Sequence, residues 1–178
     1  MAQGKFDEID RQKVIKAVES AYNVALSPVG RRRKHLQDQS GRPFWVFGGY
    51  DHWHGIPKEM MTIDTRRAAQ GVLVIALRYS SRIDIYSGTL APLIQERNRL
   101  PKTEKDYQFN LKFDANTHES ITIREISGLH LNKISTIIYD NASKEADSAV
   151  NTLQKIIRRT PEKQMHVLLK RLKADHDG

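Results

Sequence analysis

The first regular pattern along the chain is an apolar residue at every third or fourth position between Asp7 and Leu26. Asp7, Glu8 and Asp10 stand at the front of this stretch, and its apolar positions are Val14, Val18, Ala21, Tyr22 and Ala25. Such spacing puts the apolar side chains on one face of a helix, and acidic side chains stabilise a helix N-terminus. We therefore expect an amphipathic helix that ends before Ser27. The polar, turn-rich residues 31–41 that follow are expected to form a loop.

Residues 43–90 contain patterns that are typical of strands. Phe44 to Phe47 is aromatic and β-branched and ends at two glycines, and Val72 to Leu77 is continuously apolar. A continuous run of this kind predicts a strand that is buried on both faces. Arg82 to Tyr86 alternates polar and apolar residues, so residues 72–86 predict a hairpin. Between these strands we expect a short strand around Ile56 to Met61, and one or two helical turns over residues 62–69 with Thr62 or Asp64 as the cap.

A second hairpin is predicted farther along the chain. Tyr107 to Phe113 has the cleanest alternation in the sequence, and Ile121 and Ile123 continue it after the turn-forming residues 114–117. This pattern indicates two antiparallel strands. Ala91 to Asn98 favours a short helix, whereas Leu131 to Tyr139 fits a strand or a helix.

Helical spacing returns after Ser143 and continues to residue 174, with a break at Thr160 and Pro161. Together the patterns predict an α+β fold with a central, mainly antiparallel sheet or partly closed β-barrel, an N-terminal amphipathic helix and a C-terminal helical hairpin. We expect one domain over residues 1–178. Its parts are the N-terminal helix (1–30), a β-rich core (43–140) and the hairpin (143–174).

Composition excludes several classes of site. None of the 178 residues is cysteine, which rules out disulfides, iron–sulfur clusters, cysteine-ligated zinc and thiol nucleophiles, and favours a reducing compartment. The longest apolar run, Val72 to Leu77, is too short to cross a bilayer, and the first ten residues have no apolar targeting segment. We expect a soluble, cytoplasmic protein without a membrane partner.

Positive charge is concentrated toward the two ends of the chain. Lysine and arginine number 29 against 21 acidic residues, giving a net charge of +8. Arg31, Arg32, Arg33 and Lys34 are consecutive, and the tail holds further cations, among them Arg158 and Arg159. A solvated loop or helix face would explain either group alone. Two groups around a neutral middle favour a polyanionic partner whose phosphates these side chains would contact.

One segment, residues 43–57, holds both tryptophans of the chain together with other aromatic residues. Its phenylalanines are expected in the core of a strand. Aromatic rings beside the Gly48–Gly49 turn could instead stack on bases, a role for which we consider Trp45, Tyr50 and Trp53, with Asp51 and His54 beside them to read base edges. The alternative is that Trp53 packs over the end of the sheet.

His52 and His54 are two positions apart, so on a strand both imidazoles would face the same side. With Asp51 or Glu59 they could hold a divalent metal, although a hydrogen-bonded structural pair is the other explanation. Motifs for known nucleotide and hydrolase sites are missing: the chain has no GxxxxGK[ST], GxGxxG or GxSxG, and no acidic residue precedes a lysine by two positions, as metal-dependent restriction-type nucleases require.

These observations lead to three hypotheses. The first is a nucleic-acid-binding protein, for DNA rather than RNA and without a cofactor, that could belong to a DNA defence or restriction-type system. Its basic flanks would hold phosphates, and residues 50–54 would contact bases. The second is a small metal-dependent nuclease or phosphodiesterase that uses His52, His54 and Glu59. The third is a basic module that binds an acidic protein. Whether the protein is an enzyme, and whether it forms oligomers, stays open.

Overall fold

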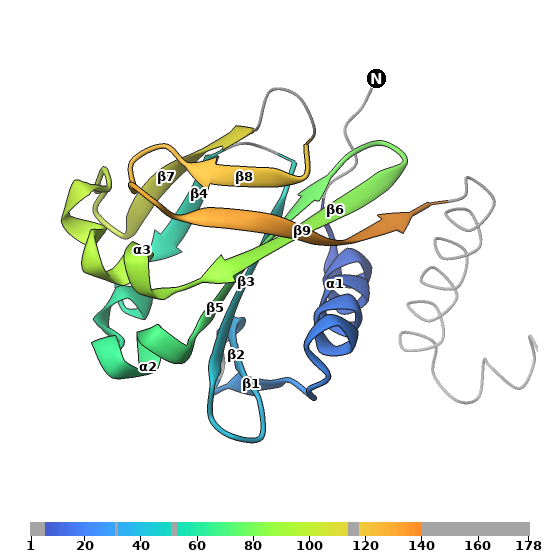
Figure 1. The fold of residues 1–178 in the computed structure, drawn as a ribbon, viewed down its shortest axis with the longest axis horizontal. Coiled ribbons are helices and arrows are strands. Elements are labelled where there is room, and N and C mark those ends of the chain that lie inside the picture. Colours follow the sequence, from blue (N-terminus) through green and yellow to red (C-terminus); the bar gives the residue numbers. More distant parts are fainter. Residues whose placement is uncertain (1–5, 31, 51–52, 114–117, 140–178) are drawn as a thin grey trace, which may run out of the picture. The chain divides into compact units, whose positions relative to one another are not determined.

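The computed structural model describes residues 6–30, 32–50, 53–113 and 118–139 (Figure 1). Contacts divide the chain into two units, Met1–Ile138 and Tyr139–Gly178. Apart from Tyr139, every described residue belongs to the first unit. The predicted turn at 114–117 and the predicted helical hairpin at 143–174 lie outside the described residues.

The first unit is an α+β structure built on a mixed sheet of nine strands in the described residues, with the order β1-β2-β3-β5-β6-β9-β8-β7-β4. Only β3 and β5 pair in parallel, and the other neighbours are antiparallel. The sheet is therefore mainly antiparallel, as predicted, and it does not close into a barrel. The strands are β1 (Ser27–Val29), β2 (Arg32–Gln37), β3 (Pro43–Gly49), β4 (Trp53–Pro57), β5 (Val72–Arg78), β6 (Arg82–Thr89), β7 (Asp106–Phe113), β8 (Ser120–Ile123) and β9 (His130–Ile138).

The described residues contain few helices, and only α1 is longer than two turns. They are α1 (Glu8–Tyr22), α2 (Thr65–Gln70) and α3 (Ala91–Gln95), with the 3-10 turns η1 (Met60–Thr62) and η2 (Arg97–Arg99). Helix α1 begins with a capping box, in which the Asp7 carboxylate accepts a hydrogen bond from the Asp10 amide. It ends at Tyr22 because Asn23 adopts a left-handed conformation with φ of 53°. The helix is thus shorter than the predicted stretch to Leu26, and Asp64 caps α2 as predicted.

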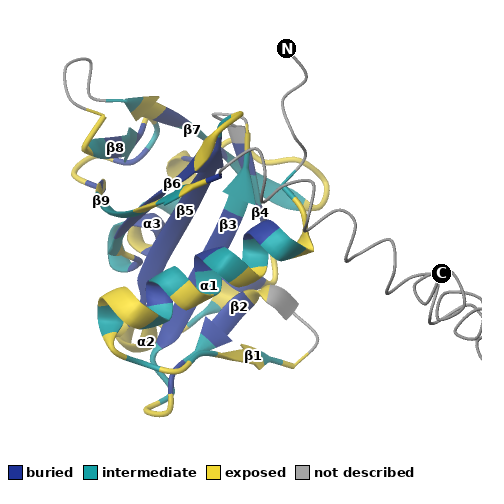
Figure 2. Cartoon of the chain, turned by 90° about the vertical axis from the view of Figure 1, so that its right-hand side faces the viewer, coloured by how far each residue is buried: buried dark blue, intermediate teal, exposed yellow. Residues whose placement is uncertain are grey.

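Apolar side chains cover both faces of the central strands. On one face of the sheet Phe47 of β3 meets Phe109 of β7 edge to face, with ring centroids 6.5 Å apart. Because these strands are not neighbours in the sheet, this contact requires the sheet to curve around its core. Helix α1 lies across the other face (Figure 2), where Tyr22 meets Phe44 at 5.3 Å. Val14 and Val18 are fully buried, which is the packing expected of an amphipathic helix.

Several sequence predictions are confirmed and others are corrected. Both predicted hairpins form, as β5–β6 and β7–β8. The stretch for which the sequence left strand and helix open is a strand, β9, which covers His130–Ile138 and ends before Tyr139. The prediction of a loop for the basic stretch is wrong, because Arg32–Gln37 forms β2, which pairs with β3. The strand predicted at Ile56–Met61 lies earlier, as β4, and Met60–Thr62 is a 3-10 turn.

Candidate nucleic-acid interface

One end of the curved sheet gathers segments that lie far apart in the sequence. Strands β3 and β5 finish there, since Gly49 pairs with Leu77, and β6 begins there, since Ile83 pairs with Arg78. Strand β9 also finishes there, because Ile138 pairs with Arg82. We call this end the rim. It consists of Tyr50, residues 78–82, the ends of β7 and β9, and the starts of β2, β4 and β6.

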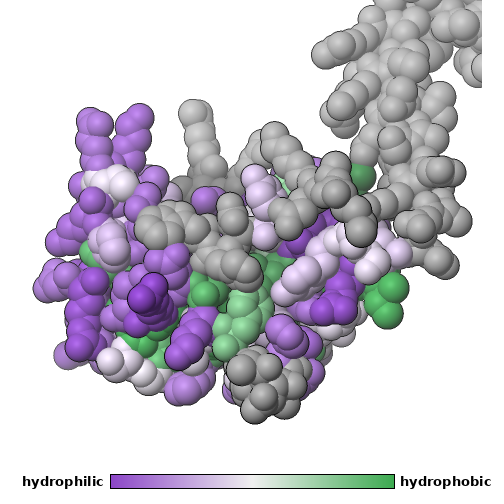
Figure 3. Space-filling model, turned by 90° about the horizontal axis from the view of Figure 1, so that it is seen from above, coloured by the Kyte–Doolittle hydropathy of each residue, from purple (hydrophilic) through white to green (hydrophobic). Residues whose placement is uncertain are grey.

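The rim brings two predicted binding segments together. Strand β2 runs antiparallel to β3, with His35 opposite Trp45. Its first residues, in the basic run, therefore lie toward the end of the sheet where β3 finishes and Tyr50 follows. Figure 3 shows the molecule from above the view of Figure 1. Among the described residues visible there, hydrophilic side chains border a smaller hydrophobic area.

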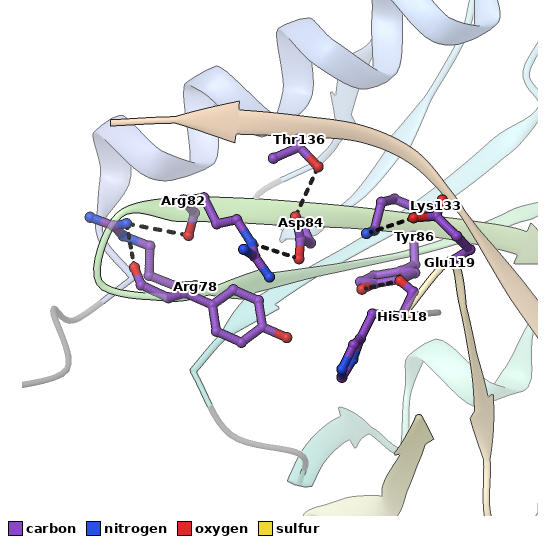
Figure 4. Close-up of polar contacts among 9 residues, drawn as sticks. Arg78, Arg82, Asp84, Tyr86, His118, Glu119, Lys133 and Thr136 are labelled. Carbon is purple, nitrogen blue, oxygen red and sulfur yellow. Dashed lines mark hydrogen bonds and ion pairs between the residues drawn. The ribbon is translucent and has the colours of Figure 1, made fainter. Parts of the chain in front are cut away.

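A polar cluster lies on the core side of β6 and β9, below the rim (Figure 4). Asp84 and Tyr86 are two residues apart on β6 and so share one face. On β9 the register shifts: Ser135 is opposite Ile85, whereas Lys133 is opposite Tyr86. The unmatched Ile134 is a β-bulge. It turns Lys133 and Thr136, which are three residues apart, toward the same side as Asp84 and Tyr86.

Asp84 is the most deeply buried member of this cluster. Its side chain is 1% exposed, and its carboxylate accepts hydrogen bonds from Arg82 Nε at 3.0 Å and from Thr136 Oγ1 at 2.8 Å. The Arg82 side chain itself is 48% exposed, and its guanidinium carbon lies 5.0 Å from the centre of the Tyr79 ring. The buried carboxylate thus holds an accessible cation at the rim, next to an aromatic ring.

Tyr86 connects this cluster to the β7–β8 connection. Its hydroxyl donates a hydrogen bond to the carbonyl oxygen of His118 at 3.0 Å. Burial raises the pKa of the Tyr86 hydroxyl well above its ordinary value, and the negative charge of Asp84 raises this pKa further. Lys133 Nζ lies 5.8 Å from the centre of the Tyr86 ring and 3.3 Å from the Glu119 carboxylate. The hydroxyl is therefore a neutral hydrogen-bond donor at neutral pH.

The structure places the predicted aromatic residues in different surroundings. Tyr50 is 50% exposed at the rim, as a base-contacting residue requires. Trp45 is fully buried and meets His35 edge to face at 6.1 Å, so the prediction of a base-contacting Trp45 is wrong. Trp53 opens β4, where its backbone pairs with Asn110. Its side chain, and all of Asp51, lie outside the described residues.

Lys34 is the member of the basic run whose side chain is described. It is exposed, and its Nζ lies 5.4 Å from the centre of the Phe47 ring. Although the residue is exposed, surrounding groups partly desolvate its ammonium, and this desolvation lowers the pKa of Lys34. The charge of Arg11 lowers the pKa further, and Asp106 opposes both effects. The side chains of Arg31, Arg32 and Arg33 lie outside the described residues, as do Arg158 and Arg159.

The predicted metal ligands are only partly described. His54 is 7% exposed and stacks on Phe109, with ring centroids 5.5 Å apart. Its imidazole therefore belongs to the core rather than to the surface of the rim. Glu59 is exposed and lies beyond the end of β4, and His52 is outside the described residues. Within the described residues no group of three or more histidine, aspartate or glutamate side chains could hold a metal ion.

Arg82, Asp84 and Tyr86 were not predicted as site residues, although a signal for them was present. Their alternation with Ile83 and Ile85 predicts a strand with one polar face. Lys133 and Thr136 carried no such signal, because their convergence depends on the bulge.

Comparison with protein-family models, with curated proteins and with solved structures finds no match to this chain. Among the described residues no helix is long and apolar enough to cross a membrane.

Proposed function

We propose that the protein binds nucleic acid at the rim, DNA rather than RNA. The observation that carries this proposal is the position of the basic run: the start of β2, Tyr50 and the exposed guanidinium of Arg82 share one end of the sheet. Cations there would contact phosphates, and Tyr50 offers an accessible ring on which a base could stack.

Residues whose side chains are not described also have roles in this proposal. Arg31, Arg32 and Arg33 would add phosphate contacts, and Asp51 and Trp53, which follow Tyr50 in the sequence, would contact bases. We further propose that residues 143–174 form a helical hairpin whose Arg158 and Arg159 contact the phosphate backbone. Such a protein would suit a cytoplasmic DNA defence or restriction-type system.

The test is the salt dependence of binding, measured by fluorescence anisotropy of the full chain with a short labelled DNA duplex, the matching single strand and the matching RNA. Neutralised phosphates release counterions, so the affinity should fall at least tenfold between about 50 and 200 mM salt. DNA should bind more tightly than RNA. Absence of binding to all three probes, or an affinity that does not change with salt, overturns the proposal.

A matched pair of lysines locates the interface. Lys112 is exposed near the end of β7 at the rim, and Lys105 is exposed just before β7 starts, at the opposite end of the same strand. Changing either to glutamine removes one positive charge. If Lys112 contacts a phosphate, Lys112→Gln should reduce the slope of log affinity against log salt by about one, and Lys105→Gln should leave it unchanged. Equal effects of the two substitutions would place the interface elsewhere.

A further inference from the structure

A pocket of about 530 Å³ lies at the other end of the central strands from the rim. It is formed where α1 and α2 end, β3 and β5 begin and β6 finishes. Its lining residues are Tyr22, Ser40, Arg42, Ala69, Gln70, Gly71, Val72, Gly88 and Thr89. Typical small-molecule sites enclose roughly 300–1,000 Å³, so this volume suits an organic ligand rather than a single ion.

The charged group in this pocket, the Arg42 guanidinium, is held in a defined position. Its Nε donates a hydrogen bond to the backbone carbonyl of Gln70 at 2.6 Å. Its guanidinium carbon lies 5.5 Å from the centre of the Tyr22 ring and 5.3 Å from that of Phe44. Tyr22 is fixed in turn, because its hydroxyl donates to Ser87 Oγ at 2.8 Å. The guanidinium is therefore preorganised, which lowers the entropy cost of binding a ligand.

The acidic residue nearest in sequence, Asp38, forms no ion pair with this guanidinium, although the charge of Arg42 is one of the smaller causes that lower the pKa of Asp38. One oxygen of the Asp38 carboxylate accepts hydrogen bonds from the Ser40 amide at 2.9 Å, the Ser40 hydroxyl at 2.6 Å and the Arg42 amide at 3.0 Å. The hydrogen bond from the Ser40 hydroxyl is the largest cause of the lowered pKa of Asp38. No carboxylate of the described residues lies within 4.0 Å of the Arg42 guanidinium nitrogens.

We propose that this pocket binds a small phosphate monoester of roughly mononucleotide size. The terminal amino groups of Arg42 face the phosphate, because a guanidinium fork matches two oxygens of a tetrahedral oxyanion. Thr89 Oγ1 accepts a long, 3.4 Å hydrogen bond from the Ala91 amide, and its own proton is a donor for a third oxygen. The organic part of the ligand lies against Ala69, Val72 and the glycine backbone. This proposal does not depend on nucleic-acid binding, because the pocket and the rim are at opposite ends of the same strands.

The first experiment is a calorimetric titration of the full chain with adenosine 5′-monophosphate, adenosine and inorganic phosphate. The monophosphate should bind at least about tenfold more tightly than adenosine, which lacks the group for a charge-assisted hydrogen bond. In NMR spectra of the unmodified protein, the amide signals of Gly71 and Gly88 should shift on addition of the monophosphate. Failure of the monophosphate to bind, or shifts confined to the rim at Gly49 and Tyr50, overturns the proposal.

The second experiment compares two substitutions, each of which removes one positive charge. Arg42→Gln should weaken binding of the monophosphate roughly tenfold or more. Arg66→Gln, on the exposed side of α2, should leave binding unchanged. If Arg42→Gln does not fold, Arg42→Lys keeps the charge but loses the fork, and it should also bind more weakly. Unchanged binding by a folded Arg42 variant, or displacement of the monophosphate by duplex DNA, contradicts a separate phosphate site.

Discussion

Arg78 of β5 and Asp10 of α1 form a buried ion pair, with Arg78 Nε 3.2 Å from Asp10 Oδ2 and both side chains almost fully excluded from solvent. Arg78 Nη1 also donates a hydrogen bond to the carbonyl oxygen of Tyr79 at 2.6 Å. The pair thus joins the first turn of α1 to the β5–β6 connection at the rim. A buried ion pair adds little to the stability of the fold when compared with well-packed apolar residues in the same place. Removal of one partner is nevertheless costly, because it leaves a buried charge without an opposite charge beside it.

We therefore expect Asp10→Asn to lower the free energy of unfolding by about 3–5 kcal/mol. The measurement is urea unfolding followed by circular dichroism. Glu8→Gln, an acidic-to-amide change at an exposed position two residues earlier, should cost less than about 0.5 kcal/mol. An equal loss for both variants would mean that the helix N-terminus, rather than the ion pair, sets the cost.

Replacing both partners tests the same idea in the opposite direction. The double variant Asp10→Leu with Arg78→Met removes both charges and restores apolar volume, so it should be at least as stable as the unmodified protein and hence more stable than Asp10→Asn alone by at least about 3 kcal/mol. Additive losses in the double variant would contradict a coupling between these two residues.

The hydroxyl of Thr136 supports the buried carboxylate of Asp84. Thr136→Val keeps the shape of the side chain and removes the donor, so the free energy of unfolding should fall by about 1–3 kcal/mol. Thr122→Val on β8 is the matched control, because the Thr122 hydroxyl makes only a long, exposed hydrogen bond of 3.4 Å to the Lys112 carbonyl oxygen. It should change stability by less than about 0.5 kcal/mol. Similar losses would show that valine packing, not the hydrogen bond, causes the effect.

The raised pKa of Tyr86 predicts how the free energy of unfolding changes at alkaline pH. Its pKa is raised in the folded state by burial and by Asp84, whereas an unfolded tyrosine has a pKa of about 10. Above pH 10 the unfolded chain therefore loses this proton first, and the free energy of unfolding falls as pH rises, by up to about 1.4 kcal/mol per unit. Below pH 10 Tyr86 is protonated in both states, so its full contribution to stability is retained.

Tyr86→Phe should consequently show a shallower loss of stability than the unmodified protein above about pH 10. Some loss remains, because burial also raises the pKa of Tyr79. At neutral pH the variant loses only the hydrogen bond to His118, worth about 0.5–1.5 kcal/mol. Parallel stability curves from neutral to alkaline pH would contradict this assignment.

Local patterns were enough to predict the hairpins. Residues 72–86 combine a continuous apolar run with an alternating segment, and residues 107–123 alternate on both sides of a turn. The position of β4 could not be predicted in this way. Trp53 begins β4 only four residues after Gly49 ends β3, yet β4 pairs with β7 at the far edge of the sheet. This arrangement depends on the curvature of the whole sheet and on the contact between Phe47 and Phe109, neither of which is encoded in a single strand.

The basic run shows the same limit for the candidate site. Consecutive cations give no apolar alternation before His35 and Leu36, so the sequence favoured a loop. Pairing with β3 overrides that local preference and forms β2. Its charge is evident from the sequence, but its position toward the same end of the sheet as Tyr50 follows from the antiparallel pairing. The cluster around Asp84 needed in addition the bulge at Ile134, which exists only through the pairing of β9 with β6.

Phe44 and Tyr50 allow the stability and the binding functions of one segment to be separated. Phe44 is fully buried beneath α1, so Phe44→Ala should lower the free energy of unfolding by about 3–5 kcal/mol through the cavity that it leaves.

Tyr50 is half exposed, so Tyr50→Ala should leave the melting temperature nearly unchanged and weaken DNA binding by roughly 1–3 kcal/mol if its ring stacks on a base. Tyr50→Phe keeps the ring and should retain the affinity. Thermal unfolding and fluorescence anisotropy on the same three variants provide the measurement. Loss of affinity in Tyr50→Phe as large as in Tyr50→Ala would assign the contact to the hydroxyl rather than to stacking, and full affinity in Tyr50→Ala would remove Tyr50 from the interface.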